Sequence, residues 1–145
     1  MGKSSYKAAR ARHNERCRHY AHYYDNLGRQ YEAKQLDAEA DLKRLNEAKK
    51  SLTHHLKDYN SFEQDFKSSC QTGVSDVLFK GDRRDKFDRI IQNVTQCITS
   101  DLAAHQENVT LLELAIVKTT LRVADYSFAA SSARGMARYF LSALW

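Results

Sequence analysis

The side chains best suited to chemistry in this chain are a cysteine and two histidines near its N-terminus. Cys17, His19 and His22 fall within two helical turns, and the two histidines share a helix face. A metal ion needs ligands three or four residues apart and at least one more from elsewhere, and no His-Glu-x-x-His or paired Glu-x-x-His set occurs. We therefore interpret these histidines as solvated surface residues and expect no metal or other cofactor.

The rest of the sequence carries no pattern typical of an enzyme. Catalytic triads, phosphate-binding glycine loops and paired carboxylates in a predicted pocket are all missing. His105 lies on an apolar stripe, where a polar residue typically helps to fix the register of paired helices. A thin pair of helices also offers no enclosed pocket for a substrate. We expect no catalytic residues and a protein that is not an enzyme.

Basic and aromatic residues gather in the N-terminal region. Residues 1–34 carry eight Lys or Arg against three acidic residues, which accounts for the whole net charge of +5. Tyrosines interleave with these arginines, and such a surface could stack on bases and pair with phosphates. The alternative is an amphipathic helix with buried tyrosines and solvated arginines. We favour the alternative because burial already explains the spacing of the tyrosines.

Apolar residues recur three and four positions apart over two long stretches, as expected for helices that share a seam. The first stretch predicts a helix from about residue 6 to residue 69, with Gly28 as its one plausible break. The second stretch begins near Phe87 and continues at least to Val123. The absence of proline suits such long helices. A helix of that length cannot bury its stripe alone and must pair with another.

The chain is predicted to turn back within residues 73–82. Gly81 supplies the reversal, since glycine accepts a positive φ without strain, and bulky Phe79 lies two residues before it. Asp82 can accept hydrogen bonds from the backbone at the start of the second helix. The fold class that follows is all-α: an elongated antiparallel two-helix hairpin with a short C-terminal helical extension.

Three regions follow from these patterns. Residues 1–34 form the basic, tyrosine-rich start of helix one, and residues 35–125 form the helical hairpin. In residues 126–145 small residues weaken the helical pattern, so this region either continues helix two, forms a separate helix or is a partly ordered tail. Its apolar end is expected to pack on the tyrosine-rich N-terminal region or on a partner.

The cysteines and the apolar runs indicate where the protein resides. The three cysteines form no Cys-x-x-Cys pair, which favours a reducing compartment over a disulfide framework. No run approaches the ~20 apolar residues that span a bilayer. The N-terminal residues lack the apolar core of a secretory signal. We expect a cytoplasmic protein without a transmembrane segment.

Three stretches together resemble a known group of proteins. Leu42–Leu52, followed by Leu78–Gly81 and Asp85–Asp88, is similar to the small helical proteins encoded beside LXG toxins, distant relatives of the Trp-X-Gly proteins of bacterial type VII secretion. In that superfamily a Trp-x-Gly turn joins two antiparallel helices. Here Phe79 stands in for the tryptophan and Gly81 matches the glycine. The resemblance covers about residues 38–123.

The sequence departs from the superfamily pattern in two places. The turn has no tryptophan, and the export signal is absent after the second helix. That signal is an aromatic residue followed four positions later by an acid, but Tyr126 is followed by Ala130 and the same spacing after Tyr139 also reaches alanine. The resemblance therefore implies an accessory partner that depends on a second small helical protein to complete the signal.

The resemblance implies a targeting factor or chaperone that binds the helical N-terminal domain of an LXG toxin and is exported, if at all, together with it. Two other functions stay open: a nucleic-acid-binding coiled coil that uses the basic N-terminal arm, which we favour less, and a self-associating structural coiled coil, so homo-oligomers stay open too. The residues predicted to bind the partner are Leu42, Leu45, Leu52, Leu56, Tyr59, Phe66, Phe79, Gly81, Phe87, Ile91, Val94, Ile98, Leu112 and Ile116.

Overall fold

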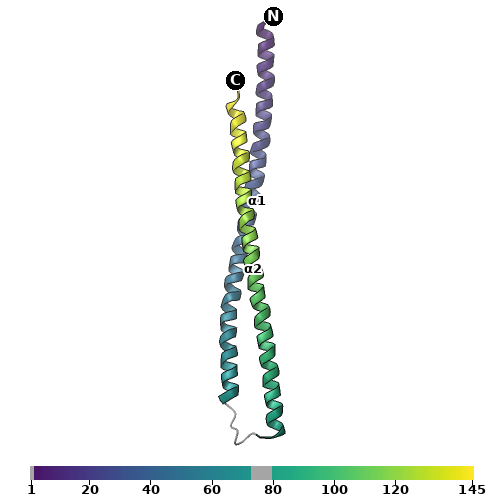
Figure 1. Ribbon diagram of the computed structural model, residues 1–145. Coiled ribbons are helices and arrows are strands. Elements are labelled where there is room, and N and C mark those ends of the chain that lie inside the picture. The colour runs from purple at the N-terminus through teal and green to yellow at the C-terminus, as the bar shows by residue number, and fades with distance from the viewer. Residues whose placement is uncertain (1, 73–79) are drawn as a thin grey trace. The chain divides into compact units, whose positions relative to one another are not determined.

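The computed structural model describes residues 2–72 and 80–145, which form two long helices packed against each other (Figure 1). Helix α1 spans Gly2–Thr72 and helix α2 spans Asp82–Ser142, and no described residue lies in a strand. The predicted all-α two-helix hairpin is confirmed. Phe79 and most of the predicted reversal, residues 73–79, lie outside the described residues.

Helix α1 is continuous through Gly28 and extends a few residues beyond the predicted limits at both ends. A glycine in a helix interior costs about 1 kcal/mol relative to alanine. Gly28 is buried in the structure, so packing against α2 offsets that cost. The plausible break at this position therefore does not form.

Helix α2 begins on the carbonyl group of Gly81. This residue has a φ of 74°, and its carbonyl oxygen accepts hydrogen bonds from the backbone N–H groups of Arg84 at 2.9 Å and Asp85 at 3.2 Å. The positive φ predicted for Gly81 is confirmed. Gly81, and not the predicted Asp82, is the N-cap residue, because Asp82 is already the first helical residue. Asp82 and Asp85 lie in the first turn, where a negative charge favours the helix dipole.

The predicted C-terminal extension is the end of α2 itself, which runs without a break to Ser142. The small polar residues that weaken the pattern alternate with Ala130, Ala133 and Ala137, and these three alanines are buried. Packing of the alanine face explains why the helix continues, since tertiary contacts routinely override weak helix propensity.

The chain divides into two units that differ from the three predicted regions. The terminal unit comprises Met1–Lys43 and Val117–Trp145, and the central unit comprises Arg44–Ile116. In Figure 1 the terminal unit is the purple part of α1 beside the yellow part of α2. The boundaries differ from the predicted ones because the units follow contacts between helices, whereas the predicted regions followed changes in composition along the chain.

Within each unit the two helix segments run antiparallel. In the central unit, Lys49 pairs with Glu113 at 2.8 Å, and the Thr99 hydroxyl donates to Glu63 nearer the other end of the same segments. In the terminal unit, residues near the start of α1 contact Trp145. In both units, earlier residues of α1 contact later residues of α2, which is the contact pattern of a helical hairpin.

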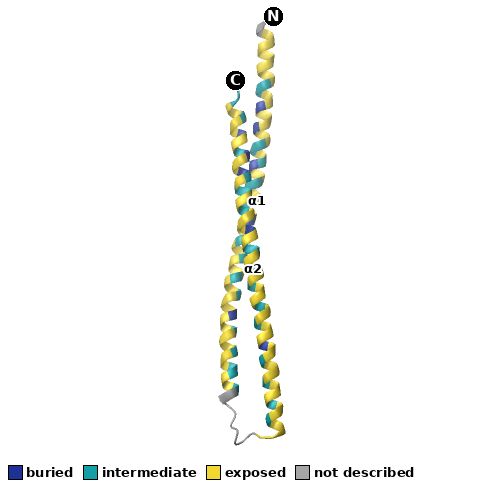
Figure 2. Ribbon diagram, viewed as in Figure 1, coloured by how far each residue is buried: buried dark blue, intermediate teal, exposed yellow. Residues whose placement is uncertain are grey.

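The two units bury different kinds of residue; Figure 2 marks where along the helices the buried positions lie. In the terminal unit, among residues 4–43 and 117–145, the buried residues are all small: Cys17, Ala21, Gly28, Ala38, Thr119, Ala130, Ala133 and Ala137. In the part of the central unit that the structure describes, the buried residues are the larger Leu56 and Ile98. Among the described residues no large side chain has less than 2% of its surface exposed. Neither unit therefore encloses a thick core.

Truncation of Leu56 to alanine should lower the free energy of unfolding by about 2–3 kcal/mol, because the side chain is 7% exposed and its removal leaves a cavity. Leu111→Ala is the matched control in the same unit. Leu111 is 57% exposed, and its truncation should change the free energy by less than about 0.5 kcal/mol. Urea unfolding followed by circular dichroism measures both, and equal effects would contradict the described seam.

Candidate protein-interaction surface

The residues predicted to bind a partner form the seam between α1 and α2. Leu56 and Ile98 are buried, Val94 is 37% exposed, and Gly81 is exposed at the start of α2. Phe79 lies outside the described residues. The half-buried members are Leu42, Leu45, Leu52, Tyr59, Phe66, Phe87, Ile91, Leu112 and Ile116. A partner could therefore reach only the outer edges of most of these side chains.

The central unit exposes other large apolar residues that the sequence prediction missed. Phe62, Ile90, Leu111 and Leu114 each have more than half of their surface exposed. They fall outside the heptad stripe, and the prediction followed that stripe alone. A helix that packs against one neighbour leaves its other sides in water. Large apolar residues outside the heptad stripe can therefore be expected on the surface, and the sequence alone is enough to find them.

An aromatic row on α1 connects two residues of the seam, Tyr59 and Phe66, with the exposed Phe62. The rings of Tyr59 and Phe62 lie 6.2 Å apart, and those of Phe62 and Phe66 lie 6.1 Å apart, both stacked. Burial raises the pKa of Tyr59, and the hydrogen bond and charge of Asp101 raise it further. A phenol is already neutral at pH 7 at its ordinary pKa, so the three rings carry no charge of their own.

A shallow groove of about 360 Å³ lies beside Leu56 in the same unit. Leu56 and Val109 give it apolar surface, and the carboxamides of Asn60, Gln64 and Gln106 supply donors and acceptors; the other lining residues are Thr53, Lys57 and Ser61. Such a groove can receive a side chain from a third helix, because apolar contact and uncharged hydrogen bonds are both available.

In the terminal unit, the side chain of Arg134 links α2 to two carboxylates of α1. Arg134 of α2 donates two hydrogen bonds to Glu32, from Nε at 3.0 Å and from Nη2 at 2.7 Å, and a third from Nη1 to Asp25 at 2.8 Å. Hydrogen bonding to Arg134 lowers the pKa of Glu32, and hydrogen bonding to Glu32 raises the pKa of Arg134. A planar guanidinium suits this arrangement because it can bind two carboxylates at once.

Gly28 lies between those two carboxylates on the same face of α1. A Cβ atom at this position would lie 3.3 Å from Cγ of Arg134 and 3.4 Å from its Cδ. The glycine therefore makes room for the stem of the arginine as it crosses α1. Asp25, Gly28 and Glu32 are spaced three and four residues apart, so the site could have been found by asking which basic residue on α2 faces this acidic pair.

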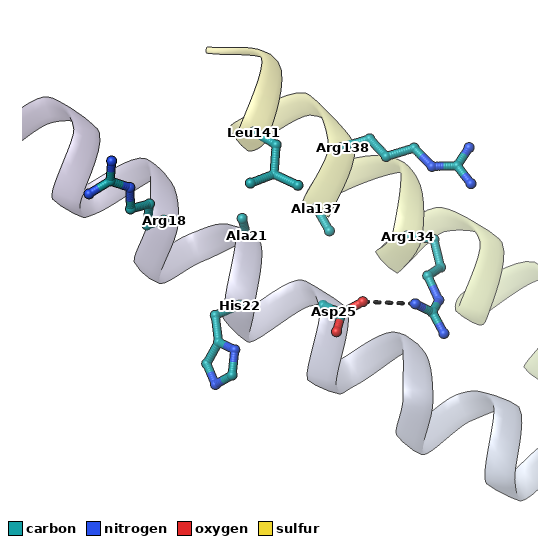
Figure 3. Close-up of a pocket in the computed structure, with 8 residues that line it drawn as sticks. All are labelled: Arg18, Ala21, His22, Asp25, Arg134, Ala137, Arg138 and Leu141. Carbon is teal, nitrogen blue, oxygen red and sulfur yellow. Dashed lines mark hydrogen bonds and ion pairs between the residues drawn. The ribbon is translucent and has the colours of Figure 1, made fainter. Parts of the chain in front are cut away.

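A groove of about 410 Å³ opens beside this ion pair (Figure 3). Ala21, Ala137 and Leu141 give it apolar surface. In Figure 3, Arg134 reaches to Asp25, whereas Arg138 extends away from the pair and His22 points away from α2. Because two carboxylates already neutralise Arg134, and the other basic side chains do not converge, the groove does not form an anion site.

The end of the chain is held by three neighbouring side chains of α1. The carbonyl oxygen of Trp145 accepts hydrogen bonds from Nε of Arg10 at 3.0 Å and from Nδ2 of Asn14 at 3.1 Å, and its backbone N–H donates to Oδ1 of Asn14 at 3.0 Å. The indole stacks on the ring of His13, with centroids 4.7 Å apart. The predicted packing of the apolar end on the N-terminal region is confirmed.

Several tyrosines of the N-terminal region are used in the same packing. Phe140 stacks on Tyr20 at 5.1 Å and on Tyr24 at 5.8 Å, and Tyr31 lies 6.4 Å from Tyr126. These contacts support the interpretation that burial explains the tyrosine spacing. The apolar spacing places Tyr20 on the same stripe as Cys17. Cys17 is buried as that spacing predicts, but Tyr20 is 47% exposed and its neighbour Ala21 is buried in its place.

Comparison with protein-family models, curated proteins and solved structures gives no significant match for this chain. Over the residues that the structure describes, no three His, Cys, Asp or Glu side chains are grouped so that they could hold a metal ion. None of the described helix segments combines the length and apolarity that a membrane crossing requires. The relationship to the LXG-associated proteins stays a prediction from the sequence.

Gly28→Ala should reveal how tightly Arg134 is held. In an Arg134→Ala background the substitution should stabilise the protein by about 1 kcal/mol, the ordinary gain of alanine over glycine in a helix. In the wild type the gain should be smaller or reversed, because the new methyl group presses on an arginine that is fixed at its far end. Urea unfolding of the four proteins measures the difference. An equal gain in both backgrounds would contradict the described contact.

Trp145 is the one tryptophan in the chain, so its fluorescence reports on the docked end. Asn14→Ala removes two hydrogen bonds to Trp145, each contributing about 0.5–1.5 kcal/mol. We expect emission at longer wavelength and stronger quenching by iodide. Asn26→Ala is the control, since the Asn26 side chain contacts His22 on its own helix. The same spectrum from both variants would show that the end is not held by Asn14.

Proposed function

We propose that this protein is a helical interaction protein, a targeting factor or chaperone that binds the helical N-terminal domain of an LXG toxin for type VII secretion. One observation carries the proposal: the apolar residues of the central unit are incompletely buried. Phe62, Ile90, Leu111 and Leu114 are more than half exposed, and most seam residues are half-buried. Two helices alone leave this surface in water, and further helices would cover it.

The interaction would be the packing of partner helices along the edges of the seam. Covering a half-exposed leucine or phenylalanine contributes about 1 kcal/mol, so several such residues must act together to give a stable complex. The aromatic row of Tyr59, Phe62 and Phe66 supplies large rings at one edge, and the groove beside Leu56 supplies amide groups. Aromatic residues that are flanked by weaker contacts typically dominate helical interfaces.

Export would be shared among the partners. The sequence lacks the superfamily's export signal after the second helix, so a second small helical protein would complete that signal. The chain would meet its toxin in the cytoplasm and leave, if it leaves, as part of the complex. The resemblance supports this step, and the packing of the central unit supports the binding step.

Co-expression with the LXG toxin encoded beside it tests the proposal. We expect the chain to co-purify with the toxin's N-terminal domain, and Phe62→Ala combined with Ile90→Ala to weaken the complex at least tenfold. Both side chains are exposed, at 53% and 59%, so the isolated chain should keep its helicity by circular dichroism.

The matched control is Leu36→Ala, a leucine in the terminal unit that is 65% exposed. This variant should bind the toxin domain as the wild type does. Failure of the two chains to co-purify would count against the proposed function. A complex that tolerates the double substitution would place the contact elsewhere on the chain.

A further inference from the structure

A row of arginine and tyrosine side chains runs along one side of α1 in the terminal unit. Arg12, Arg16, Tyr20 and Tyr23 are spaced four, four and three residues apart, and this spacing keeps them on one side of the helix. All four are exposed, and the two tyrosines have 47% and 55% of their surface in water. The row therefore presents two guanidinium groups followed by two rings.

Both arginines are available to an anion from outside the chain. Over the described residues neither Arg12 nor Arg16 forms an ion pair, and Arg12 donates one hydrogen bond from Nε to the carbonyl oxygen of Ala8 at 3.4 Å. The two side chains border an open hollow of about 500 Å³, which Ala9 and Glu15 also line. Glu15 is the one carboxylate in that lining, so two positive charges face one negative charge.

The surroundings of the row are basic as well. Residues 1–24 carry six Lys or Arg against Glu15 alone. Residues 126–145, which pack on them, carry two arginines and no acidic residue, and Arg134 is the one of the two that carboxylates neutralise. Such a concentration of one sign of charge attracts an anionic partner to this part of the terminal unit.

The exposed rings of the row rest on packed rings. Tyr20 stacks on Phe140 at 5.1 Å, and Tyr23 meets Tyr24 edge to face at 5.1 Å. Tyr24 in turn stacks on Phe140 at 5.8 Å. Burial explains the position of Tyr24, which is half-buried, but it does not explain the exposed Tyr23. A ring that is already held in place loses little freedom when a planar group stacks on it.

Guanidinium groups beside exposed rings suit one class of anion better than the others. A single-stranded nucleic acid uses both, because its phosphates pair with arginine and its bases stack on aromatic side chains. An acidic protein would be attracted by the charges and would leave the rings without a role. A helix that lies on an anionic membrane buries Trp, Phe or Leu, whereas the large apolar side chains exposed on residues 4–35 are all tyrosines.

We propose that this row binds a single-stranded nucleic acid, with Arg12 and Arg16 on its phosphates and Tyr20 and Tyr23 against its bases. At ~1.5 Å per residue the row is about 16 Å long, which accommodates roughly four nucleotides. This binding goes beyond the proposed function and uses no residue of the central unit. It also does not use the groove of Figure 3, because none of the four residues lines that groove.

Fluorescence anisotropy of a labelled 20-nucleotide oligothymidylate, titrated with the full chain, tests the proposal. We expect a Kd on the order of 10 μM at 0.15 M salt. Arg12→Gln combined with Arg16→Gln should weaken binding about tenfold. It should also lower the slope of log K against log salt by about 1.4, because each phosphate contact on a single strand contributes ~0.7. Arg83→Gln combined with Arg89→Gln is the matched control: it removes the same charge from exposed arginines of the central unit and should change the Kd less than about twofold.

Substitution of Tyr23 tests the stacking. Tyr23→Ala should weaken binding about fivefold or more, and Tyr23→Phe should bind as the wild type does, because the ring is retained. Phe128→Ala is the control for an exposed ring elsewhere in the terminal unit, where the side chain is 77% exposed, and should leave the Kd unchanged. All of these positions are exposed, so circular dichroism should show unchanged helicity.

Three results would overturn the proposal: no binding of the oligonucleotide at 0.15 M salt, equal losses from the two double arginine variants, or a Tyr23→Ala variant that binds as tightly as the wild type. Polyglutamate and vesicles that contain phosphatidylglycerol serve as competitors. Tighter binding of either one than of the oligonucleotide would assign the row to an acidic protein or to a membrane and would also overturn it. Because the isolated chain is measured, a chain that binds the oligonucleotide and not the toxin domain would support this inference and count against the proposed function.

Discussion

A helix that packs on one neighbour can bury only one side of itself, and this geometric constraint governs the whole protein. The terminal unit meets it with small residues: Ala21 and Gly28 on α1 and the three alanines on α2 allow the backbones to lie close together. Beside these small residues, the stacked rings of Tyr20 and Phe140 and the ion pairs of Arg134 add contacts between the two helices. The central unit meets it with larger side chains, and those side chains remain partly in water.

In the N-terminal region most acidic side chains pair with α2, whereas most basic side chains remain exposed. Residues 1–34 contain three acidic residues, and two of them, Asp25 and Glu32, bind Arg134. Arg10 is directed to the carbonyl oxygen of Trp145. The positive charge that composition assigns to this region therefore stays on exposed residues such as Arg12, Arg16 and Arg18, where it can attract an acidic surface without being needed for packing.

Periodicity predicted the helices well because the heptad spacing of large apolar residues is a strong, local signal. It predicted Leu56 and Ile98 as seam residues, and both are buried. It failed where small residues form the contact: Tyr20 was placed on the stripe, whereas Ala21 is the buried neighbour. Alanine and glycine carry little weight in a hydrophobic pattern, although close approach of two backbones depends on them.

Other features depend on contacts between residues that are far apart in the sequence. The continuity of α2 through its small polar residues follows from alanines that pack on α1, and the pattern along α2 alone does not contain that information. The pairing of Arg134 with Asp25 and Glu32 spans more than a hundred positions.

The Arg134 site should also make substitutions at distant positions of the sequence depend on one another. A lineage that loses the arginine gains nothing from a carboxylate at both 25 and 32, and the space above position 28 no longer has to be kept free of a side chain. Among related sequences these four positions should accordingly change in concert, with alanine at 28 more frequent where arginine at 134 has been replaced.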